Sequence, residues 1–436
     1  MAWGMLLALL VCLVQETPVK ATPATQSLDH WFVEDVHGDL SARYRGRWTS
    51  ADADQDLYQF LNAHYGAPKA EFSMVATLRL SEDLDGSRDV QGAYVFDSKE
   101  DTFQRAWNTR VYSLYAQWHL PGARLRFGRQ RADELPEALP FDGISCAAEI
   151  ATGVRAGVFG GMPVNLYESQ SVGDLTAGGW LSVEPWGGAT ARFEYLRLQD
   201  ENQFGLFRDD LVAVSLEQWW GAVRAWGRAT LLEAEPRDAA ARVTATTPDL
   251  IVDLQATYLF ERIQALSYGI DPYSIFLLPL EPYVEATLRL SKPLGERFGV
   301  DCSASVRRLT AKGDEGDYNH EFARVGITPH ASGWPAASIG WSLTADWWSS
   351  SADDVWTLGG DVTWRAHRAV TVGAGSSFAL WTFDELTGEE RDRVRIVHAW
   401  AKWKTAKDLV IDAKASVERS SIDTFTTVTV GVKRDF

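Results

Sequence analysis

The feature that most constrains the fold is a strict two-residue alternation at the end of the chain. In the stretch 409–417 apolar side chains alternate with mostly polar ones, and after a short polar turn the same pattern returns over 427–432. Because successive side chains of a β-strand point to opposite faces, this period predicts two strands, each with one apolar and one mostly polar face. The chain ends at Phe436, which has the parity of the apolar side chains.

Alternation of this kind recurs through most of the chain. In 40–48 an apolar stripe alternates with three arginines, and 72–80 repeats the arrangement. Later apolar stripes run through 284–290, 300–306 and 339–347, with aromatic residues mostly at the ends of the runs. A soluble β-sandwich also has one apolar face, but it would not keep its other face this rich in arginine over so many strands. We therefore predict an all-β chain built as one large sheet.

Composition narrows this prediction to a membrane barrel. The chain holds 19 Trp, a residue that collects where one end of a side chain is apolar and the other is wet. Mean hydropathy is −0.18, and the one long apolar run lies at the N-terminus, so no helix is expected to span a membrane. In lipid only helices and closed barrels satisfy every backbone group, so the sequence predicts a closed antiparallel transmembrane β-barrel.

The spacing of turns sets the predicted number of strands. Short turns alternate with longer polar links, as periplasmic turns and extracellular loops do in bacterial barrels. Acidic loops are predicted at 81–105 and 131–150, with further links at about 200–209, 233–238 and 383–392, among others. A turn at 160–163 and one more strand at about 162–169 keep the strand direction consistent. The best count is about 22 strands, within a range of about 18 to 22.

The N-terminus is predicted to be an export signal. An apolar core within 1–14 is followed by small residues suited to signal-peptidase cleavage near Ala21 or Ala24. We expect a signal peptide over 1–24, a short periplasmic segment over 25–36 and a barrel over 37–436.

Two local patterns resemble those of known outer-membrane proteins. A terminal Phe that closes an amphipathic strand, here Phe436, resembles the signal that hands bacterial barrels to their insertion machinery. The block 125–130, followed within about a dozen residues by 141–143, resembles a pattern of alginate-export-like and porin-type outer-membrane barrels. The residues that carry this resemblance are Gly128, Arg129, Gln130, Phe141, Asp142 and Gly143. The resemblance implies a bacterial outer-membrane location, a lipid bilayer as environment and transport as activity.

The polar face opposite the apolar stripes supplies the candidate site. Its first third is predicted to present a basic wall to a water-filled lumen, because a barrel of this size is too wide for side chains to fill. Ladders of arginine select anions electrostatically and can hold carboxylates or phosphates bidentately. The predicted anion path consists of Arg43, Arg45, Arg47, Arg79, Arg124, Arg126 and Arg155. An equally weighted alternative is that these arginines pair with carboxylates on neighbouring strands and rigidify the wall.

Residue patterns for catalysis, metals and cofactors are missing from the sequence. The eight His include no HExxH pair, there is no Cys-x-x-Cys-His haem site, and Cys146 and Cys302 in the mature chain make at most one disulfide. His398 has Ser377 and Asp361 as potential neighbours on the wall, but a lone lumen His is far more often structural. We predict no enzyme, no metal and no cofactor. The net charge of −17 argues against nucleic acid as a partner.

These observations predict an outer-membrane, porin-like channel that passes or exports anionic or polar solutes through an arginine-lined lumen. Two alternatives remain open at this point. The barrel could be a sleeve that holds a multihaem cytochrome, as a periplasmic or membrane-embedded partner, so that electrons rather than solutes cross. It could also be a barrel hydrolase, which would need a Ser/His/Asp cluster within hydrogen-bond reach on the wall.

Overall fold

The computed structural model describes most of the chain as β-structure. The residues it describes are 36–50, 53–67, 70–85, 107–132, 139–164, 174–202, 205–260, 282–310, 321–350, 354–384, 389–405, 408–421 and 423–436. The strands are β1 (Val36–Trp48), β2 (Ala53–Tyr65), β3 (Phe72–Asp83), β4 (Trp107–Leu120), β5 (Ala123–Ala132), β6 (Leu139–Ala151), β7 (Val154–Pro163), β8 (Leu175–Val183), β9 (Ala189–Asn202), β10 (Gly205–Trp220), β11 (Val223–Leu232), β12 (Glu235–Thr247), β13 (Leu250–Leu259), β14 (Tyr283–Leu294), β15 (Phe298–Leu309), β16 (Phe322–Ser332), β17 (Ile339–Ser350), β18 (Asp354–His367), β19 (Val370–Asp384), β20 (Glu389–Lys404), β21 (Leu409–Arg419) and β22 (Thr424–Asp435).

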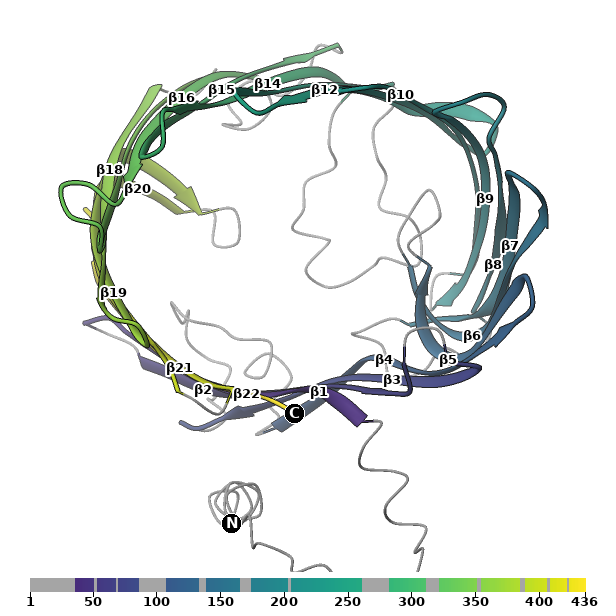
Figure 1. Cartoon of the computed structure of the whole chain (residues 1–436), viewed down its shortest axis with the longest axis horizontal. Helices are drawn as coiled ribbons and strands as arrows, with labels where there is room; N and C mark the ends of the chain where they lie inside the picture. The colour runs from purple at the N-terminus through teal and green to yellow at the C-terminus, as the bar shows by residue number, and fades with distance from the viewer. Residues whose placement is uncertain are drawn as a thin grey trace, which may run out of the picture. The chain divides into compact units, whose positions relative to one another are not determined.

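The strands close into a ring. All 22 belong to one sheet in which each strand pairs with its neighbours in sequence, and β1 pairs with β22 (Figure 1). The closing pair is antiparallel and continuous from Asp39 opposite Asp435 to Trp48 opposite Thr426. Closure leaves no free sheet edge at the seam, which is the condition for placing a sheet in lipid. The prediction of a closed antiparallel barrel with a best count of 22 strands is confirmed.

Exposure is inverted relative to a soluble protein. The apolar sides of the strands are open to the surroundings, with Val158 63% and Leu358 58% exposed, whereas Asp56 and Gln130 on the opposite sides are each 1% exposed. Exposed apolar and buried polar side chains on alternate positions are the arrangement of a transmembrane barrel. We call the apolar side of the wall the outer face and the polar side the inner face.

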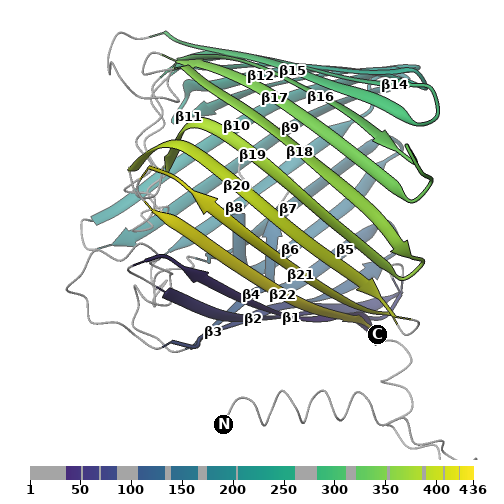
Figure 2. The ribbon, with the colours of Figure 1, turned by 90° about the vertical axis from the view of Figure 1, so that its left-hand side faces the viewer.

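The connections divide between the two ends of the ring. Tight turns such as 121–122, 152–153 and 221–222 lie at one end, which we call the turn end. The strand ends joined by connections such as 84–106 and 260–282 lie at the other end, which we call the loop end. Figure 2 shows several of the tight turns along one edge of the wall, on the same side as the C-terminus. In bacterial barrels the short turns are periplasmic and the longer loops extracellular.

Several predicted connections are wrong although the strand count is right. Most of the loop predicted at 131–150 is β6, and the turn predicted at 160–163 lies within β7. The additional strand is therefore β6 rather than a segment at 162–169. Strands also occupy most of the links predicted at 200–209, 233–238 and 383–392. In the first, β9 extends to Asn202 and β10 starts at Gly205; in the other two, β12 starts at Glu235 and β20 starts at Glu389. Charged residues at the loop end are therefore part of the hydrogen-bonded strands and do not mark where the strands end.

The predicted signal peptide 1–24 and periplasmic segment 25–36 lie outside the described residues, except for Val36, the first residue of β1. Their division at these boundaries stays a prediction. The backbone N–H and carbonyl of Phe436 bond to Gly38, at 2.9 and 2.8 Å, so the last residue joins the seam.

Candidate functional site: the inner face of the wall

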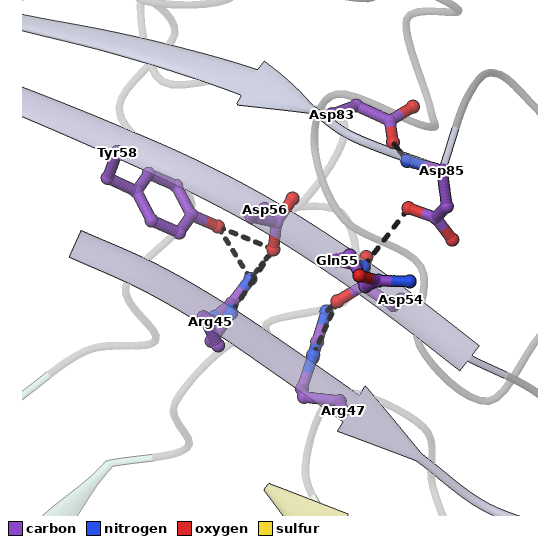
Figure 3. Close-up of polar contacts among 8 residues, drawn as sticks. All are labelled: Arg45, Arg47, Asp54, Gln55, Asp56, Tyr58, Asp83 and Asp85. Atoms are coloured by element: carbon purple, nitrogen blue, oxygen red, sulfur yellow. Dashed lines mark hydrogen bonds and ion pairs between the residues drawn. The ribbon is translucent and has the colours of Figure 1, made fainter. Parts of the chain in front are cut away.

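The inner face of β1 and β2 holds a cluster of charged side chains. Arg45 donates from Nη2 to Oδ2 of Asp56 at 2.6 Å and to the hydroxyl of Tyr58 at 2.6 Å, while Tyr58 itself donates to Asp56 at 2.9 Å (Figure 3). The Arg45 and Arg79 guanidinium carbons lie 5.2 and 5.5 Å from the centroid of the Tyr58 ring. Two of the predicted anion-path arginines therefore converge on one tyrosine.

A second pair lies one step nearer the loop end. Arg47 donates from Nε to Oδ2 of Asp54 at 2.7 Å, and Asp54 is 2% exposed (Figure 3). Beside it the backbone N–H of Gln55 donates to Asp85, which ties the end of β3 to β2. Arg45 and Arg47 are therefore balanced by carboxylates of the neighbouring strand, as the ion-pairing alternative describes.

The remaining predicted arginines differ in their surroundings. Arg43 is exposed and has no carboxylate within ion-pairing distance among the described residues. Arg126 donates to Gln117 at 2.6 Å and stacks over the ring of Tyr115 at 5.0 Å. Arg155 lies 3.7 Å from Glu184, a pair in which both side chains are more than half exposed. Such a pair is weak because water screens it.

Arg124 and Arg126 also line a cavity of about 170 Å³ beside aromatic side chains. The lining includes Phe141, Phe159 and Trp180. Deeper toward the loop end the same inner face carries an apolar cluster of Leu139, Leu196, Leu198 and Leu211, each no more than 1% exposed. The sequence reasoning missed this cluster, because alternation assigned the inner face to polar side chains alone.

Ion pairing continues around the rest of the ring. The inner face of the later strands carries arginines that each lie within 3.0 Å of a carboxylate oxygen. These pairs are Arg192 and Arg228 with Glu194, Arg224 with Glu217, Arg242 with Asp253, Arg307 with Glu285, and Arg324 with Asp346. Most partners stand on adjacent strands or two residues apart, and the pair of Arg228 and Glu194 spans from β11 to β9 across β10, so the charges form a lattice rather than one basic wall.

Some described arginines of the inner face have no carboxylate of their own. Arg43 and Arg365 have no ion-pair partner among the described residues, and Arg289 stands opposite Asp253, which already accepts from Arg242 and Thr244. Arg289 lines a wall concavity of about 580 Å³ together with Arg242 and Arg324. Arg365 lines a second concavity of about 360 Å³. Carboxylates line both concavities as well, Asp253, Asp301 and Asp346 in the first and Asp361 in the second, so an oxyanion entering either one meets groups of both charges.

The residues of the family-like pattern meet across the β5–β6 hairpin. Gly128 faces Gly143, Arg129 faces Asp142 and Gln130 faces Phe141. Arg129 donates to the two carboxylate oxygens of Asp142, from Nε at 2.8 Å and from Nη2 at 2.6 Å, and its Nη1 donates to the carbonyl of Val111 at 3.3 Å.

This hairpin separates from β4 at the same place. Pairing between β4 and β5 begins at Leu114 opposite Arg129, so the part of β4 before Leu114 pairs with β3 alone. Gly128 has a φ of 120°. A Cβ on it would overlap the carbonyl oxygen of Leu114, so only glycine fits here. The pattern therefore lies where the pairing between β4 and β5 stops.

The potential catalytic group is a single pair. His398 Nε2 lies 2.7 Å from Asp361 Oδ1 on the inner face, and within the described ranges no hydrogen bond joins His398 to Ser377. Among the described residues no three His, Cys, Asp or Glu side chains gather in a way that would hold a metal ion. Ser416 of β21 is the register partner of His398, but in the part of the chain that the structure describes no hydrogen bond joins them, so the arrangement is an Asp–His pair and not a connected triad.

Comparison with known proteins gives the fold and no family. No family model matches the chain, and no curated protein matches it. Among solved structures, the translocation pore of the P pilus usher PapC aligns with a TM-score of 0.54 at 8% identity, covering 92% of this chain and 99% of that one. The outer-membrane protein OpdK of Pseudomonas aeruginosa aligns at 0.47 with 11% identity, covering 93% and 100%. A BenF-like porin of Pseudomonas fluorescens aligns at 0.47 with 12% identity, covering 93% and 99%.

Ring closure, inverted exposure and this likeness define the class. The chain is a bacterial outer-membrane β-barrel of 22 antiparallel strands. No family model supports the alginate-export-like resemblance, which stays a prediction.

Proposed function

We propose that the barrel is a porin-like channel that passes anionic or polar solutes along its charged inner face. The observation that carries the proposal is the charge lattice itself. A ring of 22 strands is wider than its own side chains can fill, and the inner face carries ionised groups on most strands. A solute crossing there exchanges its hydration shell for charged groups that are held in place by their neighbours.

In this proposal selectivity comes from the inner-face arginines that have no carboxylate of their own, and not from all the arginines of the predicted anion path. A guanidinium already bonded to a carboxylate presents little net field, because the opposite charge lies within 3 Å. Arg43, Arg289 and Arg365 keep their charge available, and Arg124 and Arg126 add cationic groups beside aromatic rings. A carboxylate or phosphate on a solute would be attracted to these positions in turn.

The geometry supports a channel over a hydrolase. Among the described residues no hydrogen bond joins His398 or Asp361 to a serine hydroxyl, so acyl transfer would need Ser416, the register partner of His398, to come into hydrogen-bond reach. The P pilus usher, which shares the fold, is described as a translocation pore. The proposal for this chain rests on its own inner face.

Planar-bilayer recording of the purified protein tests the proposal. We expect discrete conductance steps, and in a KCl gradient a reversal potential on the anion-selective side. Arg43→Gln combined with Arg365→Gln should shift that reversal potential toward cations, whereas Asp301→Asn should shift it further toward anions. Absence of steps from correctly folded barrels would refute the channel, and cation preference in the unaltered protein would refute the role of the arginines.

A further inference from the structure

Two arginines stand side by side on the outer face at the loop end. Arg395 of β20 is the register partner of Arg419 of β21, and both side chains are exposed. Arg395 has the parity of Val397, and Arg419 that of Val417; both valines belong to the apolar outer face, at 49% and 45% exposed. We call Arg395 and Arg419 the outer arginine pair.

The outer arginine pair lacks the balancing carboxylate that two other outward arginines, Arg129 and Arg197, have. Arg129 is bonded to Asp142, and Arg197 lies 3.9 Å from Asp210. For the outer arginine pair, no carboxylate lies within ion-pairing distance in the described ranges. Like charges directly opposite each other in an antiparallel ladder repel, so the arrangement is unfavourable unless an anion lies between them.

The surroundings of the outer arginine pair are amphipathic. In the same row across the wall, Arg395 faces Phe378 of β19 and Arg419 faces Thr424 of β22. Two positions toward the turn end, Val397 faces Val417, and below these Ala399 faces Ala415. A cationic fork therefore lies directly above an apolar strip on the surface that contacts lipid.

We infer that the outer arginine pair binds the phosphate headgroup of an outer-leaflet lipid, with the acyl chains of that lipid against Val397 and Val417. Guanidinium groups bind phosphate through paired N–H donors, and two of them across one ladder step can share its oxygens. The loop end faces the outside in barrels of this kind, so the lipid belongs to the outer leaflet. Free phosphate would gain nothing from the apolar strip, which is why the site favours an amphiphile. The inference is independent of transport through the ring.

The test uses bisphosphorylated lipid A as the probe and native mass spectrometry of the intact barrel released from detergent micelles. The variant is Arg395→Gln with Arg419→Gln. The matched control is Lys292→Gln with Arg308→Gln, which removes the same charge from the outer face at two separated positions, Lys292 opposite Val300 and Arg308 opposite Val284. Folding of both is checked by the heat-dependent shift of the barrel on a gel.

We expect the variant to bind lipid A about tenfold or more weakly than the unaltered protein, the loss of about one charge-assisted contact. The control should retain its affinity, and lipid A without phosphates should bind as weakly to the unaltered protein as lipid A binds to the variant. Equal losses in variant and control would overturn the site in favour of general attraction. Displacement of lipid A by millimolar inorganic phosphate would overturn the lipid as occupant, and an unchanged affinity in the variant would overturn the proposal outright.

Discussion

The positive charges of arginines are balanced differently on the two faces of this wall. On the inner face Arg45 and Arg47 are bonded to Asp56 and Asp54, whose side chains are almost fully buried. On the outer face Arg395 and Arg419 stand opposite each other, with Phe378 and Thr424 as their other register partners and no carboxylate among the described residues within ion-pairing distance. An inner guanidinium can find an acid because every second residue of the next strand also faces inward. At the rim of the outer face the partner must come from the membrane, and this difference can be tested residue by residue.

The largest effect is expected from removing a buried inner carboxylate. Asp56→Ala removes the counter-ion of Arg45, whose side chain is 33% exposed, and the acceptor of the Tyr58 hydroxyl, so we expect a loss of about 2–3 kcal/mol. Urea unfolding in micelles measures the free energy of unfolding. The control is Asp301→Ala, whose partner His330 lies 3.3 Å away in a half-exposed pair, and it should cost less than about 1 kcal/mol. Similar losses in both would show that burial does not distinguish these pairs.

Weakening the pair of an outward arginine should cause a loss of stability of intermediate size. Asp142→Asn keeps the shape of the side chain but weakens both bonds from Arg129, so we expect a loss of about 1–2 kcal/mol in the free energy of unfolding. The same unfolding assay measures it. A stabilised variant would mean that the outward charge pair costs more to desolvate than it returns.

The outer arginine pair predicts a change of opposite sign. In lipid-free detergent, Arg395→Gln should relieve repulsion from Arg419 and raise the free energy of unfolding by up to about 1 kcal/mol. Adding lipid A should reverse the order, because only the unaltered protein is then stabilised by binding. If the variant is already less stable without lipid, the two guanidinium groups are held by something other than an added anion.

The smallest effect concerns the connection beside the seam. Asp423 accepts from the backbone N–H of Thr424 at 2.7 Å and from the Ser50 hydroxyl at 2.9 Å, and these donors lower its pKa. A lowered pKa means that this stabilisation is present above the ordinary aspartate pKa of about 4 and is lost as the pH falls through the folded value. Asp423→Asn should remove that part of the acid sensitivity. An unchanged slope of stability against pH between the two proteins would contradict the assignment.

The sequence predicts the ring far better than it predicts the contacts within it. Clean alternation, as in 409–417, fixes strand and face together, and the closing of β22 on β1 follows from the need for a sheet without edges. The strand β6 was missed because Asp142 stands at an outward position and the inward positions nearby hold Leu139 and Phe141, although Ile144 and Cys146 keep the outward period. An acidic residue near the loop end, such as Asp142, can therefore belong to a strand rather than to a loop.

Pairing depends on register, which alternation leaves open. Asp54 and Asp56 were missed as partners of the arginines because β2 has an irregular pattern, and the period of Asp54, Asp56 and Tyr58 was the signal that would have found them. Arg129 meets Asp142 only because the β5–β6 hairpin has the register that it has. Parity alone assigns Arg395 to the outer face, but its position opposite Arg419 follows from the length of the turn between β20 and β21.

The most direct test of the two-faced wall is the accessibility of single cysteines along β18 in reconstituted vesicles. In a background of Cys146→Ser with Cys302→Ser, the variants Thr357→Cys and Thr363→Cys lie on the inner face, and Leu358→Cys and Val362→Cys on the outer one. A charged, membrane-impermeant maleimide should label the first two and leave the last two unlabelled. Labelling of Leu358→Cys and Val362→Cys with protection of the threonine positions would contradict the account.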